Sequence, residues 1–444
     1  MPKAGEDLIV LLALVSQLAL PDPGWEKTDC PAGQDTVRLR CGWVEVAEDR
    51  NRPDGRRIRL FVMRKDPAVG LSRPGGDPIV FLDGGPGRAA HEDAWWAELV
   101  LGSLVDTYPL VTLDQRGTGK SAPLDCDLWP ERRISDRRYP IAAVRRCREE
   151  LTPRAALDHY ATKDAVMDLE AVRRALGIER LNLYAVSYGA RVAAGYAVLF
   201  PAHVRSMVLH SPGAFAGWPD VTRHASLRVF ERAMRGQHSG AVDAALRRLA
   251  DRPLQIPFAR GSRTDTARVG PRVGAWLLRD LLYDPASWEE FRLLIRAFRD
   301  RRASAVIATA LEDVARGESG RSVGVFIGIT CTEDVPVRPT PPAGDWISVP
   351  QEEFAEVCRE WPRARLPEWW GRAPTSNIPA LVISGSLDPV TPADSAAAFA
   401  RRMGGAHSLV VLGGGHGGTW SCAIRAVEQF VLAESIAGLP ATCR

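Results

Sequence analysis

The sequence predicts an α/β protein with a mostly parallel central sheet, helices on both faces of that sheet and an inserted helical cap. Short apolar runs typical of strands alternate with helical stretches along most of the 444 residues. A block of amphipathic helices without a convincing strand interrupts this alternation. Hydrophobic residues form 45% and charged residues 25% of the chain, as in a globular protein with a large core.

Eight apolar runs are expected to build the sheet. The first two alternate with polar residues, which indicates an antiparallel ribbon with one exposed face. The later runs are continuously apolar, as strands covered on both faces are. In chain order the eight runs span residues 43–46, 58–63, 78–82, 110–114, 181–186, 206–210, 380–384 and 408–412.

The chain is expected to divide into four parts. These are a signal peptide at residues 1–24, the first part of the α/β core at 25–212, the helical cap at 213–325 and the rest of the core at 326–444. The first part contains Lys3 and the mostly apolar segment Leu8 to Leu20, which is too short to span a bilayer but fits the hydrophobic region of a secretory signal. An N-terminal core helix is the alternative. The Pro-rich stretch 335–346 is expected to be an extended loop.

The cysteines also favour an exported protein. The chain has eight, which fall into four neighbouring pairs: Cys30 with Cys41, Cys126 with Cys147, Cys331 with Cys358, and Cys422 with Cys443. No C-x-x-C occurs, so neither a zinc site nor a thioredoxin-like motif is indicated. Local disulfides in a secreted or periplasmic protein are expected, although eight cysteines permit about 105 pairings. The alternative is a cytosolic protein with buried free thiols.

The charge of the chain argues against a nucleic-acid partner. With 57 basic and 54 acidic residues the formal net charge is +3, and no basic stripe stands out. The segment DQRGTGKS, from Asp114 to Ser121, resembles a phosphate-binding loop but carries Asp114 where the first glycine is required. Nucleotide binding is therefore not expected, and Asp114 is expected to pair with Arg116.

Ser187 is the candidate nucleophile. It follows the apolar run 181–186 and precedes a helical stretch rich in small residues, the strand–turn–helix setting of a G-x-S-x-G nucleophile elbow. Gly189 meets the need for a small residue after the serine. Ala185 stands where the first glycine of the motif belongs. A buried structural serine is the alternative.

A serine nucleophile needs a base and an orienting carboxylate. Asp388 directly follows the run 380–384, and His416 lies in a glycine-rich loop after the run 408–412. Both positions are at the carboxyl ends of strands, where open α/β sheets build their sites. Acyl transfer also needs oxyanion donors. We expect these to be the N–H of Gly85, in the loop after the run 78–82, and that of Tyr188.

These motifs together resemble a known family. In order, the chain carries GGPG (84–87), DQRGTGKS (114–121), VSYGA (186–190), SLDPVTP (386–392) and GHG (415–417). Across roughly residues 40–435 it resembles the secreted tripeptidyl aminopeptidases and prolyl-iminopeptidase-like serine peptidases of the α/β-hydrolase superfamily. It departs from them at Asp83, where a histidine is often found.

The resemblance implies a function for each matching residue. Ser187 would be the nucleophile, His416 the general base and then acid, and Asp388 its orienter, with Gly85 and Tyr188 as oxyanion donors and no metal or cofactor. Such enzymes bind a free N-terminal ammonium, and the stretch CTED makes Glu333 the first candidate for this contact and Asp334 the second. A solvated acidic pair beside a disulfide is an equal alternative.

The sequence thus predicts a serine exopeptidase acting on peptides, without a membrane span in the mature protein. A monomer is expected. An esterase or amidase acting on small acyl substrates is the first alternative, because the fold does not fix the substrate. A non-catalytic binding protein of the same fold is the second. Acidic groups that face the pocket would favour the peptidase, and a wholly apolar pocket would favour the esterase.

Overall fold

The computed structural model describes residues 24–31, 37–73, 76–129, 132–213, 218–234, 240–335 and 346–444. The expected signal segment, apart from its last residue, and most of the Pro-rich loop lie outside these ranges. Among the described helices, none is both long enough and apolar enough to cross a bilayer.

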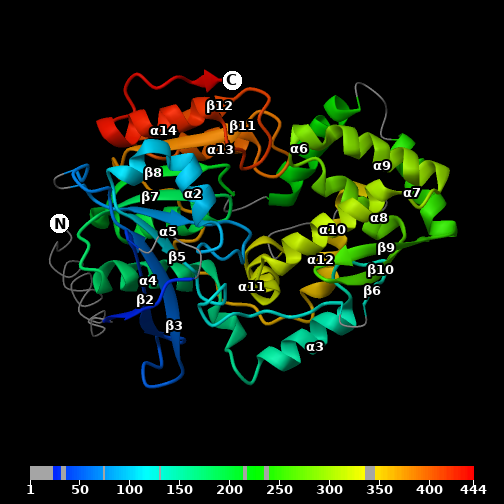
Figure 1. Ribbon diagram of the computed structural model, residues 1–444, viewed down its shortest axis with the longest axis horizontal. Coiled ribbons are helices and arrows are strands. Elements are labelled where there is room, and N and C mark those ends of the chain that lie inside the picture. The colour runs from blue at the N-terminus through cyan, green and yellow to red at the C-terminus, as the bar shows by residue number, and fades with distance from the viewer. Residues whose placement is uncertain are drawn as a thin grey trace, which may run out of the picture.

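A ten-stranded, mostly parallel sheet forms the larger lobe of the molecule (Figure 1). In spatial order its strands are β1 (Trp25–Thr28), β2 (Leu39–Ala47), β3 (Arg57–Lys65), β5 (Leu110–Leu113), β4 (Ile79–Leu82), β7 (Leu181–Val186), β8 (Val204–His210), β11 (Ala380–Gly385), β12 (Ala406–Val411) and β13 (Thr442–Cys443). The pairings from β5 to β13 are parallel, and β1, β2, β3 and β5 pair antiparallel. All eight expected runs are strands of this sheet, which confirms the predicted fold class.

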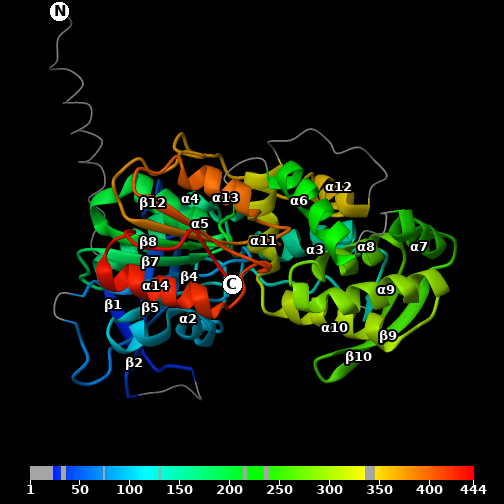
Figure 2. The same cartoon turned by 90° about the horizontal axis from the view of Figure 1, so that it is seen from above.

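Helices cover both faces of the sheet, as Figure 2 shows from above. Side chains alternate between two apolar cores, because successive residues of a strand point to opposite faces. Val80 and Leu82 pack into one core with α4 (Thr162–Ala175), α5 (Gly189–Leu199) and α13 (Ala393–Ala400). Ile79 and Phe81 pack into the other with α2 (Ala94–Leu101) and α14 (Ser421–Ala433). Burial on both faces explains why these strands are continuously apolar in the sequence.

The second lobe holds the inserted cap and lies beside the sheet (Figures 1 and 2). Its helices are α3 (Ile141–Leu151), α6 (Trp218–Ala233), α7 (Gly240–Asp251), α8 (Pro271–Asp280), α9 (Trp288–Asp300), α10 (Ala305–Ser319) and α12 (Val349–Val357). Helix α11 (Val323–Ile329) leads back toward the sheet and continues as a π-helical turn, Thr330–Asp334. Single 3₁₀ turns occur at Gly102–Asp106, Leu157–His159, Pro201–His203, Pro285–Ser287 and Trp346–Ser348.

The expectation that the segment 213–325 contains no strand is wrong. Strands β9 (Leu254–Arg260) and β10 (Arg263–Val269) form an antiparallel hairpin there. The two-residue turn Gly261–Ser262 closes it, and Gly261 has a φ of +63° that glycine adopts easily. Alternate residues of both strands are buried. That alternation and the Gly-Ser turn are the sequence signals of a hairpin, which the prediction of an all-helical block passed over.

The second lobe also recruits residues from outside the segment 213–325. Strand β6 (Arg133–Ile134) pairs in parallel with β10 and makes the hairpin a three-stranded sheet. Helix α12 packs against α8, and α3 packs against α12. The lobe is therefore assembled from three stretches of the chain.

Four disulfides join the eight cysteines: Cys30–Cys41, Cys126–Cys147, Cys331–Cys358 and Cys422–Cys443. These are the neighbouring pairs expected from the sequence. The third ties the π-helical turn after α11 to the end of α12. The fourth ties α14 to the edge strand β13.

Candidate active site

Ser187 lies on a sharp turn between β7 and α5. Its φ is +52°, in the left-handed region that a side chain other than glycine adopts only under strain. Its N–H donates to the carbonyl of His210 on the neighbouring strand β8, at 2.9 Å. At Gly189 a Cβ would stand 2.1 Å from the carbonyl oxygen of Leu82, so only glycine fits there. Ala185 is fully buried at the end of β7, which shows that the turn closes with an alanine at this position.

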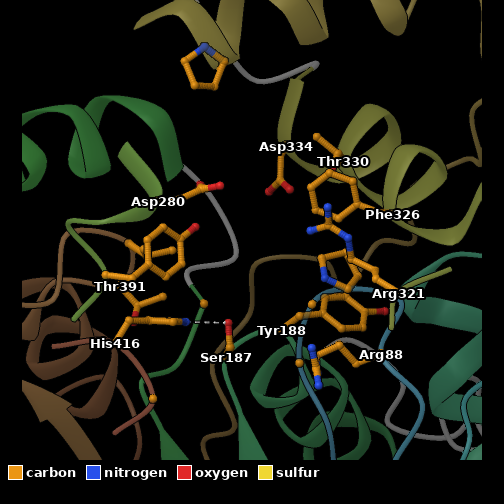
Figure 3. A pocket seen from close by; sticks show the side chains of 18 of the residues that line it. Arg88, Ser187, Tyr188, Asp280, Arg321, Phe326, Thr330, Asp334, Thr391 and His416 are labelled. Carbon is orange, nitrogen blue, oxygen red and sulfur yellow. Dashed lines mark hydrogen bonds between the residues drawn. The ribbon is translucent and has the colours of Figure 1, made fainter. Parts of the chain in front are cut away.

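His416 and Asp388 lie within hydrogen-bond reach of this serine (Figure 3). His416 Nε2 is 3.1 Å from Ser187 Oγ, and His416 Nδ1 is 2.9 Å from Asp388 Oδ2. The Asp388 carboxylate is buried and fixed by its own turn, because Oδ1 accepts the N–H groups of Val390 and Thr391 at 2.8 and 2.7 Å. Thr391 Oγ1 donates to Asp388 Oδ2 at 2.7 Å. The three residues form one chain of hydrogen bonds across the carboxyl edge of the sheet.

The loop that carries His416 is held by the second lobe. The backbone N–H of His416 donates to the carbonyl of Tyr283 at 2.8 Å. The Tyr283 ring meets the imidazole edge to face, with ring centroids 5.5 Å apart. A Cβ at Gly415 would stand 2.2 Å from the same Tyr283 carbonyl oxygen. This glycine is therefore required for the close approach of the two lobes at the histidine.

The GGPG loop follows β4 and lies against the serine. A Cβ at Gly84 would come within 3.0 Å of Ser187 Cβ, and Gly85 has a φ of +108°. In the described part of the chain, the N–H groups of Gly85 and Tyr188 donate to no protein acceptor. Two open N–H groups beside a nucleophile are the arrangement that stabilises a developing oxyanion. The far side of the loop is anchored where the Ser322 N–H donates to the carbonyl of Gly87 at 2.7 Å.

Asp83 replaces the histidine often found before GGPG. Its Oδ1 accepts the N–H of Gly84 at 2.6 Å, and its carboxyl is buried beside Asp93. Burial and the neighbouring Asp93 raise the pKa of Asp83 well above its usual value. Burial opposes ionisation of Asp93 too, but hydrogen bonds from Arg88 and Asp83 lower its pKa. The surroundings thus favour the protonated form of Asp83 and the charged form of Asp93.

A cavity of about 680 Å³ opens above the serine, between the sheet and the second lobe. This volume is in the range of small-molecule sites. Its floor includes Ser187, His416 and the GGPG loop, and its walls include aromatic side chains of the second lobe such as Trp276 and Phe354. The described residues that line it include six arginines, Arg88, Arg138, Arg191, Arg223, Arg279 and Arg321, and four aspartates, Asp83, Asp93, Asp280 and Asp334. The cavity is thus both aromatic and strongly charged.

The two acids of the CTED stretch differ in their access to this cavity. Glu333 is 2% exposed and accepts both the N–H and the hydroxyl of Thr162, each at 2.8 Å. Burial raises the pKa of Glu333 to about 7, although Arg191 and Thr162 oppose the shift. Asp334 accepts from Arg191 at 2.7 Å and lines the cavity, whereas Glu333 is not among the lining residues. Of the two acids, only Asp334 is in a position to meet a ligand in this cavity.

Asp280, at the end of α8, is a candidate that the sequence did not indicate. It lines the cavity, and Arg138 donates to its Oδ2 at 2.7 Å. Figure 3 shows Asp280 and Asp334 on opposite sides of the space above Ser187. Acidic residues are common at solvated helix ends, so the sequence does not distinguish Asp280 from a residue without a function.

The DQRG segment has a structural role, but the expected pairing of Asp114 with Arg116 is wrong. Arg116 is buried and donates to both oxygens of Asp168 on α4, at 2.6 and 2.7 Å. Asp114 accepts the N–H groups of His91 and Lys120, at 3.0 and 2.9 Å, and lies 2.6 Å from the His91 Nδ1. Backbone donors thus occupy Asp114, and Arg116 pairs with an acid 52 positions away.

Comparison with known proteins agrees with this geometry. Residues 77–267 match the family model described as alpha/beta hydrolase fold, and residues 346–443 match the model described as TAP-like protein. The chain therefore has the α/β-hydrolase fold. The first match includes the GGPG loop and the elbow at Ser187, and the second includes Asp388 and His416. Both matches therefore lie on the segments that build the cavity floor.

Proteins similar to this chain include named peptidases. It is 24% identical to a tripeptidyl aminopeptidase of Streptomyces lividans, over 94% of this chain and 86% of that protein. It is 25% identical to the serine protease Hip1 of Mycobacterium tuberculosis, over 93% of this chain and 89% of that protein. Among solved structures, the proline iminopeptidase of Mycobacterium smegmatis matches with a TM-score of 0.45 and 17% identity, over 88% of this chain and 100% of that one.

Proposed function

We propose that the protein is a serine exopeptidase that cleaves peptides from a free N-terminus. The observation that carries this proposal is a cavity with Ser187 and His416 on its floor and the carboxylates of Asp280 and Asp334 above them, with Asp388 behind His416 at hydrogen-bond distance. The similarity to tripeptidyl aminopeptidases supports the same assignment. Catalysis would use side chains and backbone groups of this chain alone.

In the first half-reaction Ser187 is acylated. His416 Nε2 takes the hydroxyl proton of Ser187 as Oγ attacks the scissile carbonyl, and Asp388 stabilises the imidazolium through Nδ1. The carbonyl oxygen becomes an oxyanion that accepts from the N–H groups of Gly85 and Tyr188. His416 then gives its proton to the leaving amine, the carbon–nitrogen bond breaks, and an ester with Ser187 remains.

In the second half-reaction water hydrolyses the ester. His416 takes a proton from water, and the hydroxide so formed attacks the ester carbonyl under the same oxyanion donors. Collapse of the tetrahedral intermediate breaks the bond to Ser187 Oγ, which recovers the proton from His416. The products are the free amine of the first step and the carboxylic acid of the released N-terminal fragment.

The substrate ammonium would be held by Asp334 and Asp280. Each has one oxygen fixed by an arginine, Asp334 by Arg191 and Asp280 by Arg138. In the described part of the chain, the second oxygen of each accepts no hydrogen bond, so it is open to a cationic ligand. An ion pair in a partly closed cavity is much less screened than one at the surface. Glu333 would support Asp334 by holding the adjacent turn.

We also propose that the segment 213–325 acts as a specificity cap on a core formed by 25–212 and 326–444, and that the protein works outside the cytoplasm. The placement of Tyr283 and Asp280 at the cavity supports the first statement. The four disulfides support the second, because disulfides persist in oxidising compartments. Sequencing the N-terminus of the protein exported by its native host would test the signal segment.

Two experiments test the catalytic proposal. A fluorophosphonate probe should label wild type and fail to label Ser187→Ala, and equal labelling of both would remove Ser187 from the mechanism. A panel of aminoacyl and tripeptidyl arylamides with free and acetylated N-termini tests the exopeptidase assignment. Equal cleavage of acetylated substrates would favour an esterase or amidase, for which the aromatic wall of the cavity would serve as the acyl pocket.

Substitution of the two CTED acids tests the amine site. Asp334→Asn should reduce kcat/KM for free N-termini by about 10- to 100-fold, the value of a charged hydrogen bond. Glu333→Gln should reduce it much less, because Glu333 does not line the cavity. A larger loss in Glu333→Gln than in Asp334→Asn would reverse this assignment.

A further inference from the structure

His210 is a buried histidine beside the candidate active site that takes no part in the proposed chemistry. It is the last residue of β8 and is 2% exposed. Its carbonyl accepts the N–H of Ser187 at 2.9 Å, so its backbone lies against the nucleophile elbow. Burial lowers the pKa of His210 to about 3, with a further contribution from the neighbouring His416. The imidazole is therefore uncharged at neutral pH.

The imidazole of His210 is held by one hydrogen bond and three aromatic rings. Its Nδ1 is 2.9 Å from the hydroxyl oxygen of Tyr184 on β7. The imidazole stacks with the Trp96 ring at a centroid distance of 5.8 Å and packs against the Trp420 ring at 5.1 Å. The Tyr184 ring meets it edge to face at 6.2 Å. The hydrogen bond to Tyr184 thus fixes the plane that the imidazole presents to the two indoles.

Aromatic packing alone does not explain a histidine at this position. The second ring nitrogen of His210, Nε2, is buried, and in the described part of the chain no protein group pairs with it. Burying a polar nitrogen without a partner costs free energy, and phenylalanine would fill aromatic surroundings without that cost. Phenylalanine could not form the hydrogen bond that orients the ring. The residue type therefore indicates that a fixed ring orientation is needed here.

Trp420 fills the inside of the loop that carries His416. A Cβ at Gly414 would stand 2.7 Å from the Trp420 indole, and a Cβ at Gly418 would stand 2.6 Å from it. These two glycines lie on either side of His416 in the sequence. A side chain at either position would displace the indole or the loop. The position of Trp420 therefore sets the path of the backbone around His416.

The segment after His210 is tied to the same two parts of the site. Ser211 is fully buried, and its hydroxyl accepts the N–H of Gly417 at 3.0 Å. The N–H of Gly213 donates to the carbonyl of Ser187 at 3.0 Å. The end of β8 therefore contacts both the candidate nucleophile and the residue that follows the candidate base.

We infer that His210 is a positioning residue for His416. Its imidazole is oriented by Tyr184 and packs against Trp420. Trp420 in turn holds the glycine-rich loop, in which His416 Nε2 lies 3.1 Å from Ser187 Oγ (Figure 3). A small displacement of a base lowers the rate strongly, because proton transfer requires hydrogen-bond contact. The inference deepens the proposed function and rests on it for the role of His416.

The test measures the kinetics of variants per active enzyme molecule. Saturating fluorophosphonate labelling counts the folded sites, and a tripeptidyl arylamide with a free N-terminus is the substrate. His210→Phe keeps an aromatic ring but loses the bond to Tyr184. It should lower both kcat and the rate constant of labelling by about 10- to 100-fold. KM should stay at the wild-type value, because His210 is not among the residues that line the cavity.

Variants of Trp420 test the path from His210 to the base. Trp420→Ala should lower kcat at least as much as His210→Phe does, and Trp420→Phe, which keeps a ring against the glycines, should lower it less. The double variant with His210→Phe and Trp420→Ala should be no slower than Trp420→Ala alone, because both changes act through one contact. Phe430→Leu, toward the other end of α14 in the same apolar core, is the control. It should lower stability in urea while kcat per labelled site stays at the wild-type value.

The inference is overturned if His210→Phe keeps the wild-type kcat per labelled site. It is also overturned if the effects of His210→Phe and Trp420→Ala multiply in the double variant. If His210→Phe gives no labelled protein, Tyr184→Phe, which removes only the hydroxyl, decides by the same two criteria. Failure of the proposed function has a different signature. Ser187→Ala would then label as wild type does, or acetylated and free N-termini would be cleaved equally, and neither result depends on His210.

Discussion

Glu333 allows a quantitative test of the structure, because its shifted pKa makes the free energy of unfolding depend on pH. The residue is buried, and burial raises its pKa to about 7 from 4.5. The folded protein therefore keeps a proton that the unfolded chain releases between about pH 4.5 and 7. Because the native state binds more protons in that window, the free energy of unfolding must fall as pH rises through it. A displacement of about 2.5 pKa units corresponds to about 3 kcal/mol.

Glu333→Gln removes this titration without removing the hydrogen bonds. A glutamine oxygen can accept the Thr162 N–H as Glu333 Oε1 does, and its amide can donate to the Thr162 hydroxyl oxygen in place of the bond that this hydroxyl donates to Glu333 Oε2. The variant and wild type should have similar free energies of unfolding at about pH 4.5. At about pH 8 the variant should be more stable than wild type by roughly 3 kcal/mol.

Urea unfolding followed by tryptophan fluorescence at several pH values measures this difference. Glu149→Gln, at an exposed glutamate of α3, is the control and should follow wild type at each pH. The reasoning is refuted if the stability difference between Glu333→Gln and wild type stays constant or declines as pH rises. Either result would mean that Arg191 and Thr162 stabilise the carboxylate at least as much as burial penalises it.

Three further predictions follow from single contacts. Replacing Cys331 and Cys358 together by serine removes a disulfide with a sequence separation of 27. This should lower the free energy of unfolding, measured by urea titration, by about 3 kcal/mol, and unchanged stability would contradict it. Gly189→Ala should abolish fluorophosphonate labelling because of the 2.1 Å clash, while Gly320→Ala, where the nearest atom is 3.7 Å away, should not. Asp83→Asn should extend activity to higher pH, because the raised pKa of Asp83 means that its contribution to stability is present below that pKa and lost as pH rises through it. An unchanged alkaline limb in a pH–rate profile would exclude this role.

The strands and the residues on the cavity floor could be predicted because their signals are local. Ser187, Asp388 and His416 each follow an apolar run directly, and parallel strands bring their carboxyl ends to one edge of the sheet. Alanine in place of the first glycine of the motif, at position 185, is tolerated for an equally local reason. The backbone of the turn comes close to β4 at Gly189, where an added Cβ would clash with the Leu82 carbonyl oxygen.

The walls of the cavity could not be predicted in the same way. Which acid of the CTED stretch lines the cavity depends on Thr162 and Arg191, which lie far away in sequence and hold the two carboxylates. The partner of Arg116 was missed for the same reason, since Asp168 lies on another helix. Such choices are settled by packing between elements, and a single sequence carries no record of that packing.

The contacts between the lobes argue that the inserted lobe does more than shape a pocket. The carbonyl of Tyr283 accepts the N–H of His416, and the carbonyl of Gly87 accepts the N–H of Ser322. The first contact holds the loop of the candidate base and the second holds the oxyanion loop. Without the inserted lobe the N–H of His416 would lose its protein acceptor, and the GGPG loop would lose its anchor at Ser322. The proposed specificity and the proposed catalysis are therefore coupled, because the residues proposed to choose the substrate lie on the segments that position the groups proposed to cleave it.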